Sequence, residues 1–327
     1  MNKDLYYVYC KGILGVKTNQ TKFRWIYGSV APQTSLEEYE NCAVKLDLCI
    51  KPEKQLGDIV DCDKRFQSYM WNSKTKTMYC RRTLFRYFKI GFNIRIADNT
   101  VFAEVGCNYS RFVQNRVMNL HGIYYLLADI INVVLLKNGF LSLYASAVYS
   151  KIYNRCTVCF APPNTGKTLT ATKLCESAKY ELVGEDIVIT DTRNVYSCPW
   201  TLSYRKSSSA MDDAGSLSRK NMVTVSNLCQ SCELTDIVVL SLGKKSIIEK
   251  KSEVFQQISI LNGYLFCYYA TPIVKMLAYF DEEYRNDWDN FAKSMLKEIT
   301  ENCNCCLILA ETPESFYEIV DFETNRK

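Results

Sequence analysis

Histidine is almost absent from this chain, in which His121 is the only one among 327 residues. A single histidine excludes metal sites that need several imidazole ligands, and any mechanism that needs two histidines. We expect His121 to pack or to cap a helix start, because it lies outside the motifs that carry chemistry. Long apolar runs are also missing, since Asp129 and Asn132 interrupt the closest one, residues 123–134. No segment therefore reaches the length of a membrane-spanning helix.

The chain also lacks targeting signals, repeats and strongly charged tracts. The N-terminal sequence MNKDLYYVYCKG does not have the basic start, apolar core and small-residue cleavage site of a secretory signal. The net charge of +5 is spread along the chain, without the dense basic and aromatic stripe that is typical of nucleic-acid-binding proteins. These features predict a cytoplasmic protein with no nucleic-acid partner and no membrane partner. They leave open whether it forms a homo-oligomer.

Cysteine, in contrast, is abundant, with 16 residues. Reduced thiols are expected in a chain without a secretion signal. The spacings match no known zinc finger, so we expect these side chains to behave mainly as small core residues. A structural zinc is the alternative for one CxxC pair together with a late cluster: Cys229, Cys232, Cys303, Cys305 and Cys306.

The length allows roughly two domains, and the apolar content of 48% is that of a globular protein. Residues 1–115 alternate between apolar and polar over short runs separated by turn signals, which predicts a β-rich N-terminal domain. This region contains no catalytic motif. The expected strands span residues 5–16, 23–30, 43–50, 66–71, 77–81, 85–96 and 100–105.

Residues 116–327 are expected to form an α/β nucleotide-binding domain, so that the chain is α+β overall. Apolar residues at three- and four-residue spacing predict a helix over 108–137, which Asn138-Gly139 would end. A hairpin of the strands at 140–149 and 156–160 would bring Tyr144 and Ser146 near the loop described next. Further strands are expected at 180–189, 195–198, 235–242 and 305–310, and further helices at 167–177, 252–269, 272–280, 288–300 and 313–320.

The stretch 155–191 organises this second region. Its short apolar strand stops at Pro162-Pro163, because proline cannot continue a strand, and helical spacing begins at Lys167. A turn between a strand and a helix N-terminus leaves backbone N–H groups unpaired and pointing one way. Such a turn is suited to binding phosphate.

The loop matches the end of the P-loop pattern G-x-x-x-x-G-K-[ST] at Gly166, Lys167 and Thr168, while Ala161 replaces the first glycine. Asn164 favours the loop, since asparagine tolerates the left-handed conformation. ATP and Mg²⁺ are the expected cofactors, with Lys167 at the β- and γ-phosphates and Thr168 on the metal. The residues expected to contact the nucleotide are Pro163, Asn164, Thr165, Gly166, Lys167, Thr168 and Leu169.

Two consecutive carboxylates, Glu185 and Asp186, follow a glycine in the next expected strand. Alternation along a strand would put them on opposite sides. One of them could then face Mg²⁺ and the other the substrate. An exposed acidic turn is the alternative interpretation.

The order of these elements resembles that of the HPr kinase/phosphorylase group. It consists of a strand with Ala145-Ser146-Ala147-Val148, the loop, the helix and a Leu-Val-Gly-Glu-Asp strand. This group belongs to the phosphoenolpyruvate-carboxykinase-like nucleotide-binding fold, and the resemblance covers about residues 120–205. Asn164 falls on the family's middle glycine, Glu185 and Asp186 fall on its paired acids, and Tyr144 stands where many relatives have a histidine. The resemblance implies an ATP-dependent, Mg²⁺-assisted kinase that phosphorylates a hydroxyl group.

The acceptor implied is a serine or threonine of a peptide or protein, or a small hydroxyl metabolite. By resemblance, Glu185 is the expected base and Asp186 the acid that holds Mg²⁺ with Thr168. Arg205, at the start of a long polar loop, is the first candidate to stabilise the transferring phosphoryl group. Two alternatives stay open: an NTP-hydrolysing regulator without an acceptor, and a degenerate nucleotide-binding module in which Ala161 and Glu185 mark lost catalysis.

Overall fold

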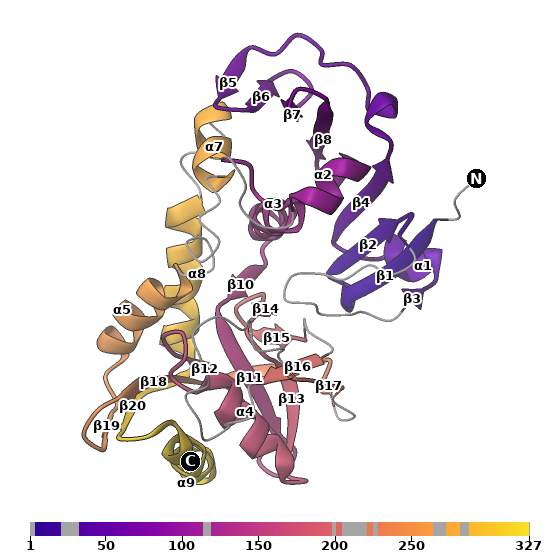
Figure 1. The fold of residues 1–327 in the computed structure, drawn as a ribbon. Helices are drawn as coiled ribbons and strands as arrows, with labels where there is room; N and C mark the ends of the chain where they lie inside the picture. Colours follow the sequence, from indigo (N-terminus) through magenta and orange to yellow (C-terminus); the bar gives the residue numbers. More distant parts are fainter. Residues whose placement is uncertain are drawn as a thin grey trace. The chain divides into compact units, whose positions relative to one another are not determined.

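The computed structural model describes residues 4–20, 33–113, 119–197, 201–204, 221–224, 228–263, 273–281 and 288–326. The chain forms two compact units (Figure 1). The first contains Met1–Leu141 and Phe266–Ser294, and the second contains Ser142–Leu265 and Met295–Lys327. The boundary expected after residue 115 therefore lies inside the first unit, because α3 (Ile123–Lys137) packs on strands β4 and β9 of that unit.

The first unit is built on a nine-stranded sheet of order β3-β1-β2-β4-β9-β8-β7-β6-β5. The pairs β2–β4 and β4–β9 are parallel and the others antiparallel. The β-rich character expected from alternation is confirmed, while the strand expected at 23–30 lies outside the described residues. The strands are β1 (Leu5–Cys10), β2 (Leu14–Thr18), β3 (Gln33–Thr34), β4 (Val44–Lys51), β5 (Lys64–Phe66), β6 (Tyr69–Asn72), β7 (Thr77–Leu84), β8 (Phe88–Ala97) and β9 (Thr100–Gly106). The helices are α1 (Leu36–Glu40), the 3₁₀ helix η2 (Glu53–Gln55), α2 (Cys107–Phe112), α3 and α7 (Ile273–Phe280).

The helix expected over 108–137 is two helices, α2 and α3. His121 lies between them and is 4% exposed. The Tyr69 hydroxyl lies 3.0 Å from His121 Nδ1, and the Tyr109 hydroxyl donates to the His121 carbonyl at 2.9 Å. Helix α3 ends at Lys137 with Asn138 as its C-cap, and Gly139 follows with a φ of +81°, as the C-cap prediction requires. His121 thus packs in the core, as expected.

The second unit is built on another nine-stranded sheet, of order β10-β14-β15-β18-β12-β11-β13, with β20 on β18 and β19 on β20. Strand β12 pairs in parallel with β18 and antiparallel with β11, which confirms the expected hairpin. The strands are β10 (Leu141–Leu143), β11 (Ala145–Ser150), β12 (Arg155–Phe160), β13 (Tyr180–Gly184), β14 (Val188–Thr190), β15 (Asn194–Tyr196), β18 (Ser231–Leu242), β19 (Ser246–Ile248) and β20 (Asn304–Ala310), with β16 (Thr201–Tyr204) and β17 (Asn221–Thr224) as a separate pair. The helices are α4 (Lys167–Glu176), α5 (Lys251–Asn262), the 3₁₀ helix η4 (Pro313–Ser315) and α9 (Phe316–Arg326). Helix α8 (Trp288–Asn302) begins in the first unit and passes into the second after Ser294.

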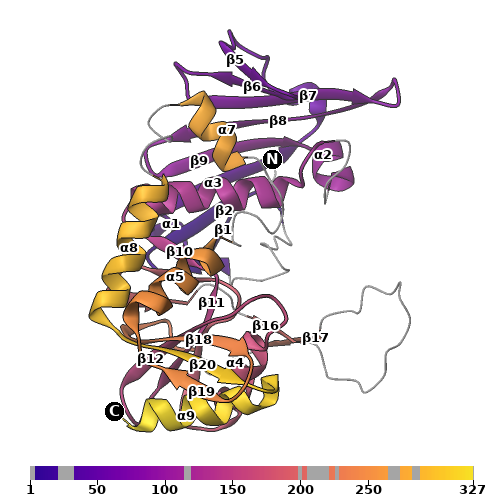
Figure 2. The same ribbon diagram turned by 90° about the vertical axis from the view of Figure 1, so that its left-hand side faces the viewer.

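The core of the second unit lies between the sheet and the helices α4 and α9, which also contact each other (Figure 2). Its centre is formed by apolar side chains of β12, β18 and β20, strands that are nearly continuous apolar runs because both of their faces are covered. The structure is therefore a mixed α/β protein with two large sheets. None of the helices in the described part of the chain is long and apolar enough to cross a membrane.

The cysteines of the described residues are free thiols. In the same residues, no three His, Cys, Asp or Glu side chains come together in an arrangement that could hold a metal ion. Cys229 and the late cluster Cys303, Cys305 and Cys306 are buried. Burial raises the pKa of the Cys303 thiol to about 12, which keeps this thiol in its neutral form.

Candidate functional site

The loop between β12 and α4 leads into a helix start that no side chain caps. Helix α4 begins at Lys167, and its N-cap residue, Gly166, offers no side chain to cap the first backbone N–H groups. Asn164 and Gly166 have φ angles of +64° and +121°, so the left-handed conformation expected at Asn164 is present. Ala161 is fully buried and is not among the described residues with positive φ. Its methyl group packs in the core, and the absence of the first glycine of the pattern creates no backbone strain there.

Gly166 is held against the C-terminal segment of the unit. A Cβ atom at this position would lie 2.9 Å from Pro313 Cβ, in addition to requiring a φ of +121°. We expect Gly166→Ala to lower the free energy of unfolding by roughly 2–3 kcal/mol, because strain and overpacking add. Gly139→Ala is the matched control, since Gly139 also has positive φ but has nothing within 4 Å of the added atom. Urea unfolding should show a larger loss for Gly166→Ala, and equal losses would contradict the contact with Pro313.

Lys167 is buried, with 5% of its surface exposed. Its Nζ has no hydrogen-bond acceptor among the described residues and lies 3.2 Å from the centroid of the Tyr144 ring. Burial lowers the pKa of Lys167 to about 8, while the negative charges of Asp186 and Glu185 oppose this shift. The site therefore contains an ammonium group that makes no hydrogen bond to the described residues.

Tyr144 is positioned by a residue distant in the sequence. Its backbone N–H donates to Asn262 Oδ1 at 2.9 Å, and Asn262 Nδ2 donates to the Ser142 carbonyl at 3.3 Å. Tyr144 directly precedes β11, and within that strand Ser146 pairs with Cys159 of β12. The buried Ser146 hydroxyl has no partner within the described chain. The expected hairpin is present, and it brings the Tyr144 ring into contact with the Lys167 ammonium of the loop.

The two carboxylates lie between β13 and β14, in a bend that interrupts the single strand expected over 180–189. The Thr168 hydroxyl donates to Glu185 Oε1 at 3.0 Å. Glu185 is 4% exposed, whereas Asp186 is only partly buried. The sequence predicts Asp186 as the acid beside Thr168, but the hydrogen bond joins Thr168 to Glu185.

The other predicted contact residues follow the course of the loop. Thr165 is buried, and its N–H donates to the Pro162 carbonyl at 3.3 Å, while Pro163 and Leu169 are partly buried and Asn164 is exposed. Arg205 lies outside the described residues. The sequence does not predict Asn262 and Pro313 as site residues. Neither belongs to a local motif, and only the folding of the chain brings them to the site.

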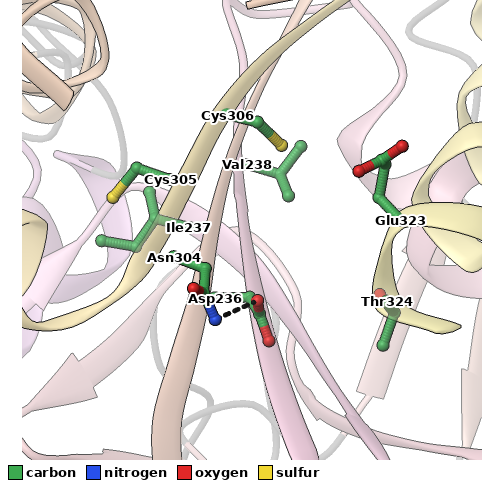
Figure 3. Close-up of a pocket in the computed structure, with 8 residues that line it drawn as sticks. All are labelled: Asp236, Ile237, Val238, Asn304, Cys305, Cys306, Glu323 and Thr324. Carbon is green, nitrogen blue, oxygen red and sulfur yellow. Dashed lines mark hydrogen bonds between the residues drawn. The ribbon is translucent and has the colours of Figure 1, made fainter. Parts of the chain in front are cut away.

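A small cavity elsewhere in the second unit is not a nucleotide site. It measures about 20 Å³ and lies between β18, β20 and α9 (Figure 3). That volume holds about one water molecule. Asp236 lines it and accepts a hydrogen bond from Asn304 Nδ2 at 3.3 Å. Its other lining residues are Ile237, Val238, Cys305, Cys306, Glu323 and Thr324.

The fold and the site define a mixed α/β protein with a strand–loop–helix element and two acids beside it. A scan of protein-family models and a search of curated proteins found no match to this chain. Among solved structures, the chain is similar to the Hpr(Ser) kinase/phosphatase from Coxiella burnetii, with a TM-score of 0.23 and 11% sequence identity. The match covers 33% of this chain and 77% of that chain. A similarity this low does not establish a common function, so the function is inferred from the site itself.

Proposed function

We propose that the second unit binds ATP with Mg²⁺ and transfers the γ-phosphoryl group to a hydroxyl group. The observation that carries this proposal is the buried Lys167 ammonium, which lies at the start of α4 near two carboxylates and lacks an acceptor among the described residues. A buried charge is costly unless it is paired. Phosphate oxygens would supply the missing partners.

The residues present fit both ligands. Uncapped N–H groups at the start of α4 suit phosphate oxygens. The Thr168 hydroxyl and the Glu185 carboxylate, 3.0 Å apart, are oxygen ligands of the kind that Mg²⁺ prefers, and the metal commonly needs only one or two carboxylates besides phosphate and water. When bound, Mg²⁺ would neutralise charge on the phosphates.

The contacts suggest different roles for the two acids from those expected. We assign Glu185 to the metal side, because it is buried against Thr168. Asp186 is more open to solvent, so an incoming hydroxyl can reach it, and we assign it as the base that accepts the hydroxyl proton. The acceptor is a serine or threonine of a peptide or protein, or a small hydroxyl metabolite. Arg205 remains the proposed residue at the transferring group.

Conservative amides separate these roles. Asp186→Asn is expected to retain Mg²⁺-dependent ATP binding and to lower turnover about 10²- to 10⁴-fold, since the amide cannot accept the proton. Glu185→Gln is expected to raise the Mg²⁺ concentration needed for half-maximal ATP binding in calorimetric titrations. The opposite pattern would return the base role to Glu185 and the metal role to Asp186.

The contact between Lys167 and Tyr144 favours a second candidate, a nucleotide-binding module without catalysis. There the ring, rather than a phosphate, would keep the ammonium in place. The wild-type protein decides between the candidates when ADP release is measured with and without a panel of hydroxyl acceptors. Release that depends on an acceptor supports the kinase, and acceptor-free release indicates an NTP-hydrolysing regulator. Binding without release indicates the non-catalytic module.

A further inference from the structure

The turn that joins β7 to β8 in the first unit presents two aromatic side chains to solvent. Tyr87 is 89% exposed and Phe85 is 78% exposed, the highest fractions among the exposed large hydrophobic side chains of the described residues. The turn projects from the sheet of this unit, at the end of the strands where α2 lies (Figure 2). Phe112, the last residue of α2, is 53% exposed and packs edge-on against Phe88, with ring centroids 4.6 Å apart. Phe88, the first residue of β8 after the turn, therefore connects the turn to the end of α2.

The backbone of this turn does not suit its residues. Phe85 and Arg86 have φ angles of +48° and +67°, in a region that bulky side chains avoid and that glycine or asparagine usually occupies in hairpins. Of the nine non-glycine residues with positive φ in the described chain, Phe85 is the only aromatic one. A strained, solvent-exposed phenylalanine does not contribute to the core. Its presence points to a role in contacting a partner.

The charged residues of the turn and its two strands have one sign. An acid lies beside the start of α2, where Glu53 accepts a hydrogen bond from the Asn108 backbone N–H. Arg86, Lys89 and Arg111 are exposed, and residues 78–97 contain no aspartate or glutamate. Asn108 Nδ2 donates to the Lys89 carbonyl at 3.0 Å, which attaches α2 to β8 beside the turn. The basic side chains therefore surround the aromatic ones on the same projecting structure.

We propose that this aromatic–basic tip docks on the surface of a membrane that contains anionic lipid. The tip consists of Phe85, Arg86, Tyr87, Lys89, Arg111 and Phe112. Aromatic rings are favoured at the level of the lipid headgroups, and Lys and Arg side chains are attracted to anionic headgroups. A projecting tip can contact a flat bilayer, whereas proteins usually hold single-stranded nucleic acid in a groove. The shape of the tip therefore favours a membrane as the partner. The interaction is peripheral and needs no spanning helix, and it departs from the expectation that the chain has no membrane partner.

Vesicle sedimentation of the full chain tests the proposal. Vesicles of phosphatidylcholine mixed with phosphatidylglycerol should bind the protein, phosphatidylcholine alone should not, and added salt should weaken the binding. Phe85→Ser with Tyr87→Ser is expected to lower the partition coefficient about tenfold or more, because both apolar contacts are lost. Arg86→Ala and Lys89→Ala should each lower it about fivefold.

Ile152→Ser is the matched control, because Ile152 is 59% exposed in the turn between β11 and β12 of the second unit. This variant should bind vesicles like the wild type, and circular dichroism with thermal melting should show that all variants are folded. The proposal is overturned if the wild type does not bind anionic vesicles, or if the double serine variant binds them equally well. It is also overturned if the protein retains a labelled single-stranded RNA but no vesicles, since nucleic acid would then be the partner.

Discussion

Replacement of Lys167 by methionine is expected to lower ATP turnover about 10²- to 10³-fold and also to stabilise the nucleotide-free protein at pH 7. Loss of the ammonium removes the charge assigned to the β- and γ-phosphates, and a loss of about 10²- to 10³-fold in turnover is typical when one electrostatic contact to a reacting group is removed. Methionine has a similar length and keeps the apolar contacts of the buried stem. The burial cost of the charge disappears with the substitution.

The sign and size of the stability change follow from the pKa. Burial lowers the pKa of Lys167 from 10.5 to about 8. Below pH 8 the side chain is protonated in both states, so the cost of burying its charge is fully present. Between pH 8 and about 10 only the unfolded state keeps the proton, so stability rises with pH. The lowered pKa corresponds to a destabilisation of the folded protein by roughly 3 kcal/mol at pH 7. The interaction of the ammonium with the Tyr144 ring offsets up to about 2 kcal/mol of this cost.

We therefore expect Lys167→Met to raise the free energy of unfolding by roughly 1–3 kcal/mol at pH 7 and by less at pH 10. Urea unfolding at the two pH values, with ATP turnover on the same preparations, measures both effects. Lys173→Met on the same helix is the control, because the Lys173 side chain is 43% exposed and forms a surface ion pair with Glu176. Such a pair contributes little. Destabilisation by Lys167→Met, or an equal gain at both pH values, would refute the assignment of a buried, protonated lysine.

Much of this site could be predicted because its signals are local. Proline ends β12, helical spacing begins at Lys167, and asparagine occupies a position with positive φ; each depends on only a few neighbouring residues. The hairpin of β11 and β12 follows in the same way from two apolar runs with a short turn between them. Alternation likewise predicts most strands of the first unit.

The rest depends on contacts between distant parts of the chain. Asn262 fixes Tyr144 across 118 residues, and Pro313 packs on Gly166, and no local pattern encodes either contact. The return of Phe266–Ser294 to the first unit depends on α7, where Phe280 stacks on Trp71 with ring centroids 5.7 Å apart. The bend at Glu185 also depends on such contacts. The residues of the bend are compatible with a continuous strand, and tertiary contacts such as the hydrogen bond from Thr168 to Glu185 decide the conformation.

Arg155→Met is expected to give the largest loss of stability among the variants considered, at about 3 kcal/mol, with little change in ATP affinity. Arg155 Nε donates to Asp236 Oδ2 at 2.8 Å, and its Nη2 also hydrogen-bonds that carboxylate. The two side chains are only 12% and 10% exposed. Removal of the guanidinium leaves the buried carboxylate with two hydrogen bonds from other described residues. The Thr235 hydroxyl donates at 2.7 Å, and Asn304 Nδ2 donates at 3.3 Å (Figure 3). Neither neutral donor replaces the lost charge.

A double-mutant cycle separates the charge from the packing. Asp236→Asn in the Arg155→Met background removes the uncompensated charge and should recover about 2 kcal/mol of the loss. Urea unfolding, with hydrogen exchange of β12 and β18 peptides, measures the recovery. ATP affinity should stay unchanged throughout, because Arg155 begins β12 and the phosphate loop follows its end, roughly 16 Å away along the strand. If the two substitutions were simply additive, the ion pair would contribute only packing. If ATP affinity fell together with stability, the two ends of β12 would not be independent. The loss of the ion pair at the start of β12 would then alter the phosphate loop through the parallel pair β12–β18.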